Sequence, residues 1–238
     1  FNHSNSDIFT FDTIPYFLLT RSDFQARYGL LLARHADLSP QALLQHWNAA
    51  PVPAAFYAEV RENPAYSKTW PEQQVEGLSV YRTDVARGVD LPGTLREGQG
   101  WRPGAKRQAL PDWHLDKIAA LDMRTRVVSA YENTHQKNYI SEKVFDAFVV
   151  GGIPTAYAGP DHRLHDLIPE AAMLNTYGLD AQAAACRIAT FTPDMACAEA
   201  WLETARRLQA RFTDLAAITQ ERRRITDLVL SALESCLS

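Results

Sequence analysis

The segment YENTHQKNYISEK (131–143) gathers two acids, two bases, two asparagines, two tyrosines and a histidine, without a glycine or proline. It lies between a β-branched apolar run, TRVVSA, and VFDAFVV, which has the pattern of a buried helix face. Ser141 stands where a helix N-cap is expected, so the next turn would present unpaired N–H groups. Such N–H groups attract anions, and Lys143 adds a full positive charge beside them. This spacing predicts a phosphate site.

The elements around this segment predict an α/β domain with a Rossmann-like, mainly parallel sheet and flanking helices. Strands are expected at 53–60, 125–131 and 153–159, and they alternate with helices at 78–89 and 141–150. Ligands bind such sheets beyond the carboxyl ends of the strands. The polar segment begins where the strand at 125–131 ends, which is the expected place for a site.

The remaining chain predicts helices before and after this sheet. Ser39 is a suitable N-cap, and Pro40 suits the first position of a helix. Residues 1–17 are expected to be irregular or to hold one short strand, and residues 61–77, with two prolines, to form a long loop. The expected elements also include helices at 21–36 and 39–50, a strand and turn at 90–101, a basic loop at 101–113, a short helical piece at LDKIAAL, a mixed segment after 160, and two amphipathic helices at the C-terminal end.

These elements divide the chain into three expected parts. An N-terminal helical or linker region covers 1–50, the sheet domain covers 51–200, and the C-terminal helices cover 201–238.

The composition is that of an ordinary soluble globular protein. Among 238 residues, 46% are hydrophobic and 22% charged, and the net charge of −4 gives no general reason to expect nucleic acid as a partner. An anion site must therefore be local. Three widely spaced cysteines without a CxxC motif favour a reducing compartment over disulfides or zinc. We expect a cytoplasmic, bacterial protein; peripheral membrane association stays open, because ERRR (221–224) suits an attachment surface.

The sequence YENTHQKNYISEKVFDAFVVGGIPTAYAGP (131–160) resembles the signature of the α1,3/α1,4-fucosyltransferases. That signature reads F-E-N, a spacer, Y-[IVT]-[TS]-E-K, a hydrophobic helix with an alanine, and then P-x-x-x-G-x-P with two hydrophobic residues after the first proline. The match keeps the spacing of the run from Tyr139 to Lys143 and includes polar positions that core packing would not dictate. Weaker resemblance extends from about residue 54 to about residue 195, and FNHSNSDIF (1–9) resembles the segment that joins the family's two domains.

The resemblance implies the C-terminal, donor-binding domain of a GT-B-type enzyme, in which two Rossmann-like domains face each other across a cleft. It implies that Arg82, Asn133, Tyr139, Glu142 and Lys143 bind the donor, GDP-fucose. The two cations would hold the diphosphate, Arg82 through a bidentate contact and Lys143 as a point charge. Glu142 would accept hydrogen bonds from sugar or ribose hydroxyls, while Asn133 and Tyr139 would supply uncharged hydrogen bonds and a stacking face.

The activity implied by the resemblance is an inverting transfer of fucose from GDP-fucose to a GlcNAc- or Glc-containing oligosaccharide. Inversion requires a carboxylate base opposite the leaving group. Only residues 1–50 precede the donor domain, so the base stays unassigned, with Asp7, Asp12 and Glu59 as candidates by default. No bound metal is needed if two cations neutralise the leaving diphosphate, and stimulation by a divalent cation stays open.

Other interpretations remain open at this point. The chain is alternatively a catalytically deficient GDP-sugar-binding domain or partner subunit, or a transferase that uses another nucleotide-sugar. His135 is expected at the surface, and His162 and His165 lack an evident third partner for a metal site. Arg102, Lys106 and Arg107 predict a solvated basic loop, with a donor-site lid as the second interpretation.

Overall fold

A computed structural model describes residues 2–20, 22–102 and 110–237 of the chain. Its centre is a five-stranded sheet in the order β4-β1-β5-β7-β8, and each neighbouring pair is parallel. The strands are β1 (Val52–Tyr57), β4 (Leu95–Glu97), β5 (Thr125–Ser129), β7 (Ile153–Ala156) and β8 (Leu174–Asn175). The predicted α/β class and the mainly parallel sheet are confirmed.

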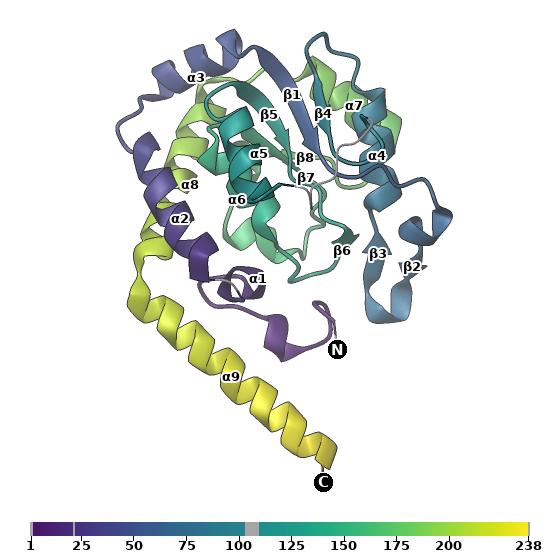
Figure 1. The fold of residues 1–238 in the computed structure, drawn as a ribbon, viewed down its shortest axis with the longest axis vertical. Helices are drawn as coiled ribbons and strands as arrows, with labels where there is room; N and C mark the ends of the chain where they lie inside the picture. Colours follow the sequence, from purple (N-terminus) through teal and green to yellow (C-terminus); the bar gives the residue numbers. More distant parts are fainter. Residues whose placement is uncertain (1, 21, 103–109, 238) are drawn as a thin grey trace.

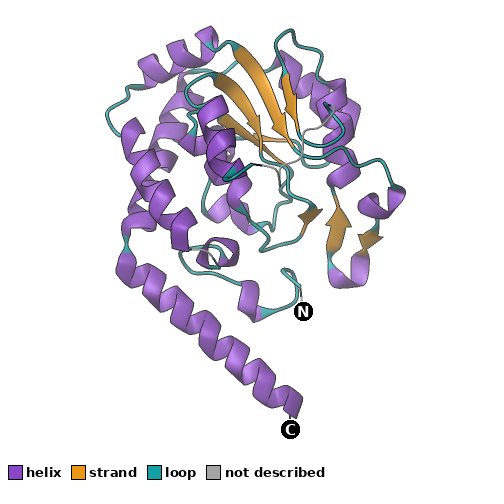
Figure 2. Ribbon diagram, in the orientation of Figure 1, coloured by secondary structure: helices purple, strands orange, loops and turns teal. Residues whose placement is uncertain are grey.

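Helices cover both faces of the sheet (Figures 1 and 2). Successive strand residues point to opposite faces, so Ala54 and Phe56 belong to one hydrophobic cluster and Ala55 to the other. Helices α4 (Ser79–Gly88) and α7 (Ala181–Thr190) supply the first cluster. The second is built from α2 (Ser22–Leu32), α3 (Pro40–Ala49), α5 (Trp113–Leu121), α6 (Glu142–Val149) and α8 (Met195–Thr213).

The connections place a topological switch point between β1 and β5. From β1 the chain passes through α4 to β4 on one side, and from β4 it passes through α5 to β5 on the other side of β1. The chain leaves β1 toward one face of the sheet and leaves β5 toward the opposite face. In open α/β sheets the crevice beyond such a pair of strands is the usual ligand site.

Two buried tryptophans fix the end of α6. Trp47 of α3 donates from Nε1 to the carbonyl oxygen of Gly151 at 2.8 Å, and Trp201 of α8 donates to that of Gly152 at 2.9 Å. Both indoles are almost fully buried. The helices that precede β1 and the helix that begins at Met195 therefore share one core with the sheet. In α3, Ser39 is the N-cap and Pro40 the first residue, as predicted.

The segment 61–77 is not a plain loop. It folds into β2 (Thr69–Trp70) and β3 (Val75–Gly77), joined to β6 (Thr134–His135) in a small antiparallel sheet. Asn63 caps a 3-10 turn, η3 (Pro64–Ser67), and a second turn, η4 (Pro71–Gln73), ends at Gln74 with φ of 53°. The prolines that indicated a loop therefore shape the turns of a hairpin, which pairs with the polar segment through β6.

Other departures from the sequence expectation are short or weakly patterned elements. Residues 2–17, the described part of this segment, hold no strand; they contain η1 (Asp7–Phe9) and the start of α1 (Tyr16–Leu19). Beyond β7 lie η6 (Arg163–Asp166), η7 (Glu170–Ala172), β8 and α7, none of which was predicted individually. Helix α7 is rich in alanine and has few large apolar residues, so its pattern gives little helical periodicity.

The last helix, α9 (Leu215–Leu237), extends away from the body (Figure 1). Near its start, the buried carboxylate of Glu221 accepts from the backbone N–H groups of Asp12 at 2.6 Å and Thr13 at 2.9 Å. The two predicted C-terminal helices are thus confirmed, and the second one anchors the N-terminal segment. No helix within the described ranges is long and apolar enough to cross a membrane.

Replacing Gly98 by alanine is expected to lower the free energy of unfolding by about 3 kcal/mol, because strained backbone costs about 1–3 kcal/mol and a clash adds to it. Gly98 has φ of +125°, and a Cβ there would lie 2.6 Å from the carbonyl oxygen of Ala58. Gly178→Ala is the matched control: φ is +78° but nothing lies within 4 Å, so only about 1 kcal/mol of strain is expected. Urea denaturation of both variants measures the difference, and equal losses would contradict the close approach.

Candidate functional site

A pocket of about 280 Å³ lies at the switch point between β1 and β5. The chain after β1, the start of α4 and the chain after β5 all contribute to it. Its lining includes Arg61, Tyr66, Trp70, Ser79, Arg82 and Asn133. Two of the five predicted site residues, Arg82 and Asn133, thus face the crevice in which the α/β topology places ligands.

Arg82 and Asn133 are in direct contact. The guanidinium donates from Nη1 to Oδ1 of Asn133 at 2.5 Å, and the backbone oxygen of Asn133 accepts from the N–H of Leu78 at 2.9 Å. Arg82 is only 9% exposed, and its Nε has no hydrogen-bond partner among the described residues. Burial lowers the pKa of Arg82 despite the nearby carboxylate of Glu132. The site therefore holds a buried guanidinium with a hydrogen-bond donor to spare.

Lys143 is held by acidic and hydroxyl groups at the start of α6. Its Nζ lies 2.8 Å from Oε2 of Glu132, 2.7 Å from Oγ of Ser141 and 3.5 Å from Oε1 of Glu142. Burial alone would lower the pKa of Lys143, but the two carboxylates raise it above its ordinary value. The two carboxylates therefore favour the charged form of this lysine at the start of α6.

Ser141 is the N-cap of α6, but its hydroxyl does not cap the helix. The Oγ donates to Glu132 at 2.7 Å, and the backbone N–H of Ser141 donates to the same carboxylate at 2.7 Å. Ser141 makes no side-chain capping bond to the first turn of α6. The positive end of the α6 dipole is thus left to the charged groups around it.

Glu142 and Tyr139 complete the predicted set. Burial would raise the pKa of the Glu142 carboxyl, but Lys143 and Lys117 help to lower it overall, so this carboxylate is ionised. Burial, and then the charge of Glu132, raise the pKa of Tyr139. The positive charges of Lys143 and Arg82 act in the opposite direction and lower it. Tyr139 is therefore close enough to both predicted cations, Arg82 and Lys143, for their charges to act on it.

Glu132 is the residue of this site that sequence reasoning missed. It joins the start of α6 to the loop after β5 through Ser141 and Lys143. Its negative charge also acts on Arg82 and raises the pKa of that guanidinium against the effect of burial. The signal was present, because Glu132 occupies the acidic position of the F-E-N part of the signature, next to Asn133. Its role became visible only once the fold had brought it to Lys143, eleven positions further along the chain.

The N-terminal segment binds to the same loop. The backbone N–H of His3 donates to Oε1 of Gln136 at 3.0 Å, and the N–H of Asn138 donates to the carbonyl oxygen of His3 at 3.1 Å. Ser4 Oγ donates to the carbonyl oxygen of Gln74, at the hairpin turn, at 2.9 Å. The ring of His3 lies 4.8 Å from that of Tyr139, and burial lowers the pKa of His3 to about 4. The segment thus connects the hairpin to the site loop.

The three default candidates for a base differ in position. Asp7 begins η1, and the backbone of Asp12 is bound to α9, so neither lines the pocket at the switch point. Glu59 follows β1, pairs with Arg61 and lies within electrostatic range of Arg82. Glu59 is therefore the one candidate of the three that the fold brings next to the predicted site.

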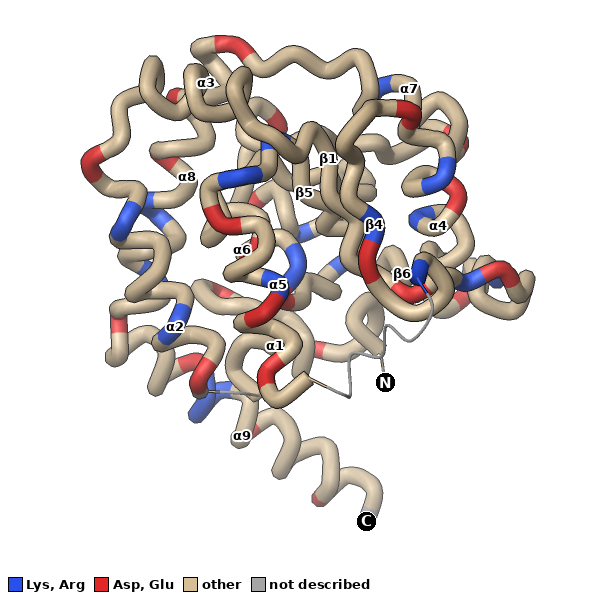
Figure 3. The backbone as a smooth tube through the Cα atoms, turned by 45° about the horizontal axis from the view of Figure 1, so that its top comes forward, with Lys and Arg blue, Asp and Glu red and all other residues tan. Residues whose placement is uncertain are grey.

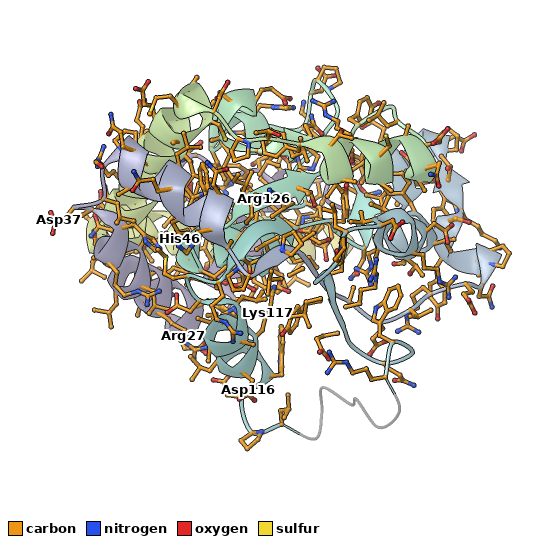
Figure 4. All side chains as sticks on the ribbon, turned by 90° about the horizontal axis from the view of Figure 1, so that it is seen from above. Arg27, Asp37, His46, Asp116, Lys117 and Arg126 are labelled. Atoms are coloured by element: carbon orange, nitrogen blue, oxygen red, sulfur yellow. The ribbon has the colours of Figure 1, made fainter. Side chains whose placement is uncertain are left out.

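A buried polar network lies beneath the start of α6. The carboxylate of Asp146 is fully buried and accepts from Nζ of Lys117 at 2.8 Å, from the hydroxyl of Tyr28 at 2.7 Å and from Nε2 of His114 at 2.5 Å. Arg27 donates to Nδ1 of His114 at 2.9 Å. Figure 4 shows Arg27 of α2 and Lys117 of α5 on neighbouring helices. The network ties α2 and α5 to the helix that carries Glu142 and Lys143.

The histidines of the chain's central part have structural partners. His135 Nε2 accepts from the N–H of Gly159 at 3.1 Å, His162 Nδ1 accepts from that of Leu164 at 3.1 Å, and His165 Nε2 lies 3.0 Å from the oxygen of Gly159. His135 is half-buried rather than at the surface, because the rings of Tyr157 and His162 lie against it. Among the described residues no three His, Cys, Asp or Glu side chains are grouped so as to hold a metal ion.

Stability is expected to fall between pH 7 and pH 5, and His162→Asn is expected to reduce the slope. Burial and the charges of neighbouring histidines lower the pKa of His162 to about 3, whereas an unfolded histidine titrates near 6.5. The unfolded chain therefore binds more protons as the pH falls, which costs roughly 1 kcal/mol per pH unit from this residue. Asparagine keeps an acceptor for the N–H of Leu164. Urea denaturation at several pH values tests this, and identical slopes would contradict it.

Outside the site, charged residues of both signs occur along the described chain. Figure 3 shows acidic and basic residues interspersed along the described chain, in keeping with the net charge of −4. In the basic loop, Arg102 is 60% exposed and pairs with Glu97 at 2.7 Å, as a solvated loop predicts, while Lys106 and Arg107 lie outside the described residues. The cations of the switch-point pocket are therefore a local feature.

No model of a known protein family matches the chain, and a search among curated proteins returned no match either. The features that bear on its activity are the signature-like residues and the geometry of the pocket at the switch point.

Proposed function

We propose that this chain binds a nucleotide-sugar, GDP-fucose, as the donor half of a GT-B-type inverting fucosyltransferase. The observation that carries the proposal is the meeting of Arg82 and Asn133, two of the five expected donor-binding residues, in the pocket at the switch point. Arg82 and Asn133 are in contact there, and Glu132 and Tyr139 link them electrostatically to Lys143 and Glu142 at the start of α6. An arginine on an exposed helix face and an asparagine of a solvated loop would not need to meet in the ligand crevice.

The chemistry follows from the charges. As the bond between the sugar's anomeric carbon and the diphosphate oxygen breaks, negative charge develops on GDP. Arg82 has an unsatisfied Nε to offer, and Lys143 carries a full charge beside the uncapped start of α6. Cations placed in advance where charge develops stabilise the transition state. The acceptor hydroxyl, on a GlcNAc- or Glc-containing glycan, attacks from the opposite side and gives its proton to a carboxylate base.

One observation favours a second candidate function, a GDP-sugar-binding domain or partner subunit without transferase activity. Glu59 is the candidate base nearest to Arg82, yet it is ion-paired with Arg61. A carboxylate engaged by a guanidinium is not free to contact the hydroxyl of an acceptor.

The test is calorimetric titration with GDP, UDP and GDP-fucose, followed by transfer assays on lactosamine and lactose acceptors. We expect GDP and GDP-fucose to bind and UDP to bind at least about tenfold more weakly, a difference of about 1.4 kcal/mol. A preference for UDP, or no binding of any of the three, would overturn the proposal. Fucosyl transfer supports the enzyme, whereas tight GDP-fucose binding without transfer to any acceptor supports the second candidate.

A further inference from the structure

The residues of the switch-point pocket that lie outside the signature-like segment include one arginine and two aromatic side chains from a single stretch of chain. Arg61, Tyr66 and Trp70 belong to the stretch between β1 and α4 that folds into the β2–β3 hairpin. The backbone N–H of Arg61 donates to Oγ1 of Thr83 in α4 at 3.0 Å, and its guanidinium carbon lies 5.0 Å from the centre of the Tyr66 ring. Arg61 is thus fixed from the side of the helix and from the side of the hairpin.

The hairpin is held close to the pocket by backbone packing. The N–H of Gly77 donates to the carbonyl oxygen of Lys68 at 2.9 Å, and a Cβ at Gly77 would lie 2.6 Å from the carbonyl oxygen of Tyr66. Only glycine allows this approach. The strand β3 also pairs with β6, which follows Asn133 directly. The hairpin is therefore part of the same structure as the site loop.

The part of the pocket that is lined by Arg61 and Arg82 is suited to an anion. Arg61 and Arg82 both line it, and each guanidinium repels the other, as the effect of Arg61 on the pKa of Arg82 indicates. Arg82 is 91% buried and its Nε lacks a partner within the described residues. Helix α4 begins at the pocket with Ser79, and its N-cap, Leu78, makes no side-chain capping bond. An anion between the two guanidiniums would relieve their repulsion and satisfy these donors.

The part of the pocket that is lined by Tyr66 and Trp70 is aromatic and exposed. Tyr66 is 44% exposed and Trp70 43%, although large aromatic side chains are usually buried in a core. One face of Tyr66 is already covered by Arg61, whereas Trp70 stands in β2, the outer strand of the small sheet. An exposed indole beside an anion site is the arrangement that binds a nucleobase by stacking.

We propose that the hairpin is the base-recognising element of the site, with Trp70 stacking on the nucleobase and Arg61 acting as a second arginine contact to the diphosphate. The proposal rests on the proposed function and adds where the nucleotide's specificity lies. Tyr66 is a positioning residue, because it holds the Arg61 guanidinium from behind. The pocket of about 280 Å³ is near the small end of the usual range of about 300–1,000 Å³, so it fits part of a nucleotide-sugar, with the sugar outside.

Titrations with GDP, guanosine and pyrophosphate separate the two roles. Trp70→Ala is expected to weaken GDP and guanosine about 5- to 100-fold and to leave pyrophosphate unchanged, while Trp70→Phe, which keeps a ring, stays within about threefold. Arg61→Ala is expected to weaken GDP and pyrophosphate about tenfold or more and to leave guanosine unchanged. The matched controls, expected to be unaffected, are Tyr177→Ala, an aromatic that is 45% exposed, and Arg87→Ala, an exposed arginine of α4.

The outcomes distinguish this inference from the proposed function. If Lys143→Ala and Arg82→Ala weaken GDP binding but the Arg61 and Trp70 variants do not, the hairpin assignment is overturned and the donor site stands. If the wild-type protein binds no nucleotide, both fail. Since Arg61→Ala leaves Glu59 unpaired, Arg61→Lys serves as the folded alternative, with an intermediate loss expected. Tryptophan fluorescence is an independent measure: GDP should quench the wild-type protein more than Trp70→Phe, and equal quenching overturns the stacking role.

Discussion

Lys143→Ala is expected to weaken GDP binding by about 30-fold or more, because hydrogen bonds to charged groups contribute about 1.5–3 kcal/mol and each 1.4 kcal/mol is a factor of ten. The substitution removes the ammonium group and also leaves Glu132 and Glu142 without their shared cation. An incoming phosphate would then meet two carboxylates at the start of α6. Calorimetric titration of the variant with GDP measures the loss.

Glu132, the carboxylate that pairs with Lys143, allows a second test of the same site. In the double variant Lys143→Ala/Glu132→Gln one of the two negative charges is gone, so we expect about tenfold of the lost affinity to return. Lys137→Ala is the matched control, because Lys137 is an exposed lysine of the same loop. Unchanged GDP binding in Lys143→Ala, with the protein still folded, would remove Lys143 from the donor site.

Asp146→Ala is expected to lower the free energy of unfolding by about 3–5 kcal/mol, the usual cost of removing one partner of a buried ion pair. The carboxylate is fully buried, and its loss leaves the Lys117 ammonium, which is 5% exposed, without its 2.8 Å partner. The hydroxyl of Tyr28 and the imidazole of His114 lose their acceptor as well. Urea denaturation at pH 7 measures the change.

The double variant Asp146→Leu/Lys117→Met tests the cause. Replacing a buried ion pair by apolar groups of similar size is often neutral, so it should recover most of the loss. Burial would raise the pKa of Asp146, but Lys117 and His114 lower it overall. The stability it supplies is therefore present above the unfolded pKa near 4 and is lost as the pH falls below it. A loss under about 1 kcal/mol in Asp146→Ala would contradict this account.

The sheet was predictable where strands are apolar and helices periodic. The strands β1, β5 and β7 and the helices α4 and α6 lie where the pattern placed them, because buried parallel strands read as continuous apolar runs. The strands of the hairpin and β8 have only two or three residues each, which is too short for an alternation to appear. Their existence depends on pairing with distant segments, such as β3 with β6, that no local pattern contains.

The site was predictable in its residue types but not in its contacts. The resemblance indicated Arg82 and Lys143 as cations, and Lys143 lies at the start of α6 beside Glu132 and Glu142. That Asn133 would contact Arg82, and that Glu132 would hold Lys143, follows from the return of the chain to the switch point. The hairpin residue Trp70 carries no motif at all, so only the fold brings it to the pocket.

The docking of the N-terminal segment on the site loop has a practical consequence for spectroscopy. The imidazole of His3 is surrounded by aromatic rings, with that of Phe9 at 4.0 Å, that of Tyr139 at 4.8 Å and that of Tyr16 at 5.9 Å. Its ring protons are therefore exposed to ring currents that depend on the position of Tyr139. Since the pKa of His3 is lowered to about 4, the imidazole stays neutral at neutral pH and its proton NMR signal does not report on titration. A shift of that signal on adding a ligand would record movement of the site loop, without any label in the pocket itself.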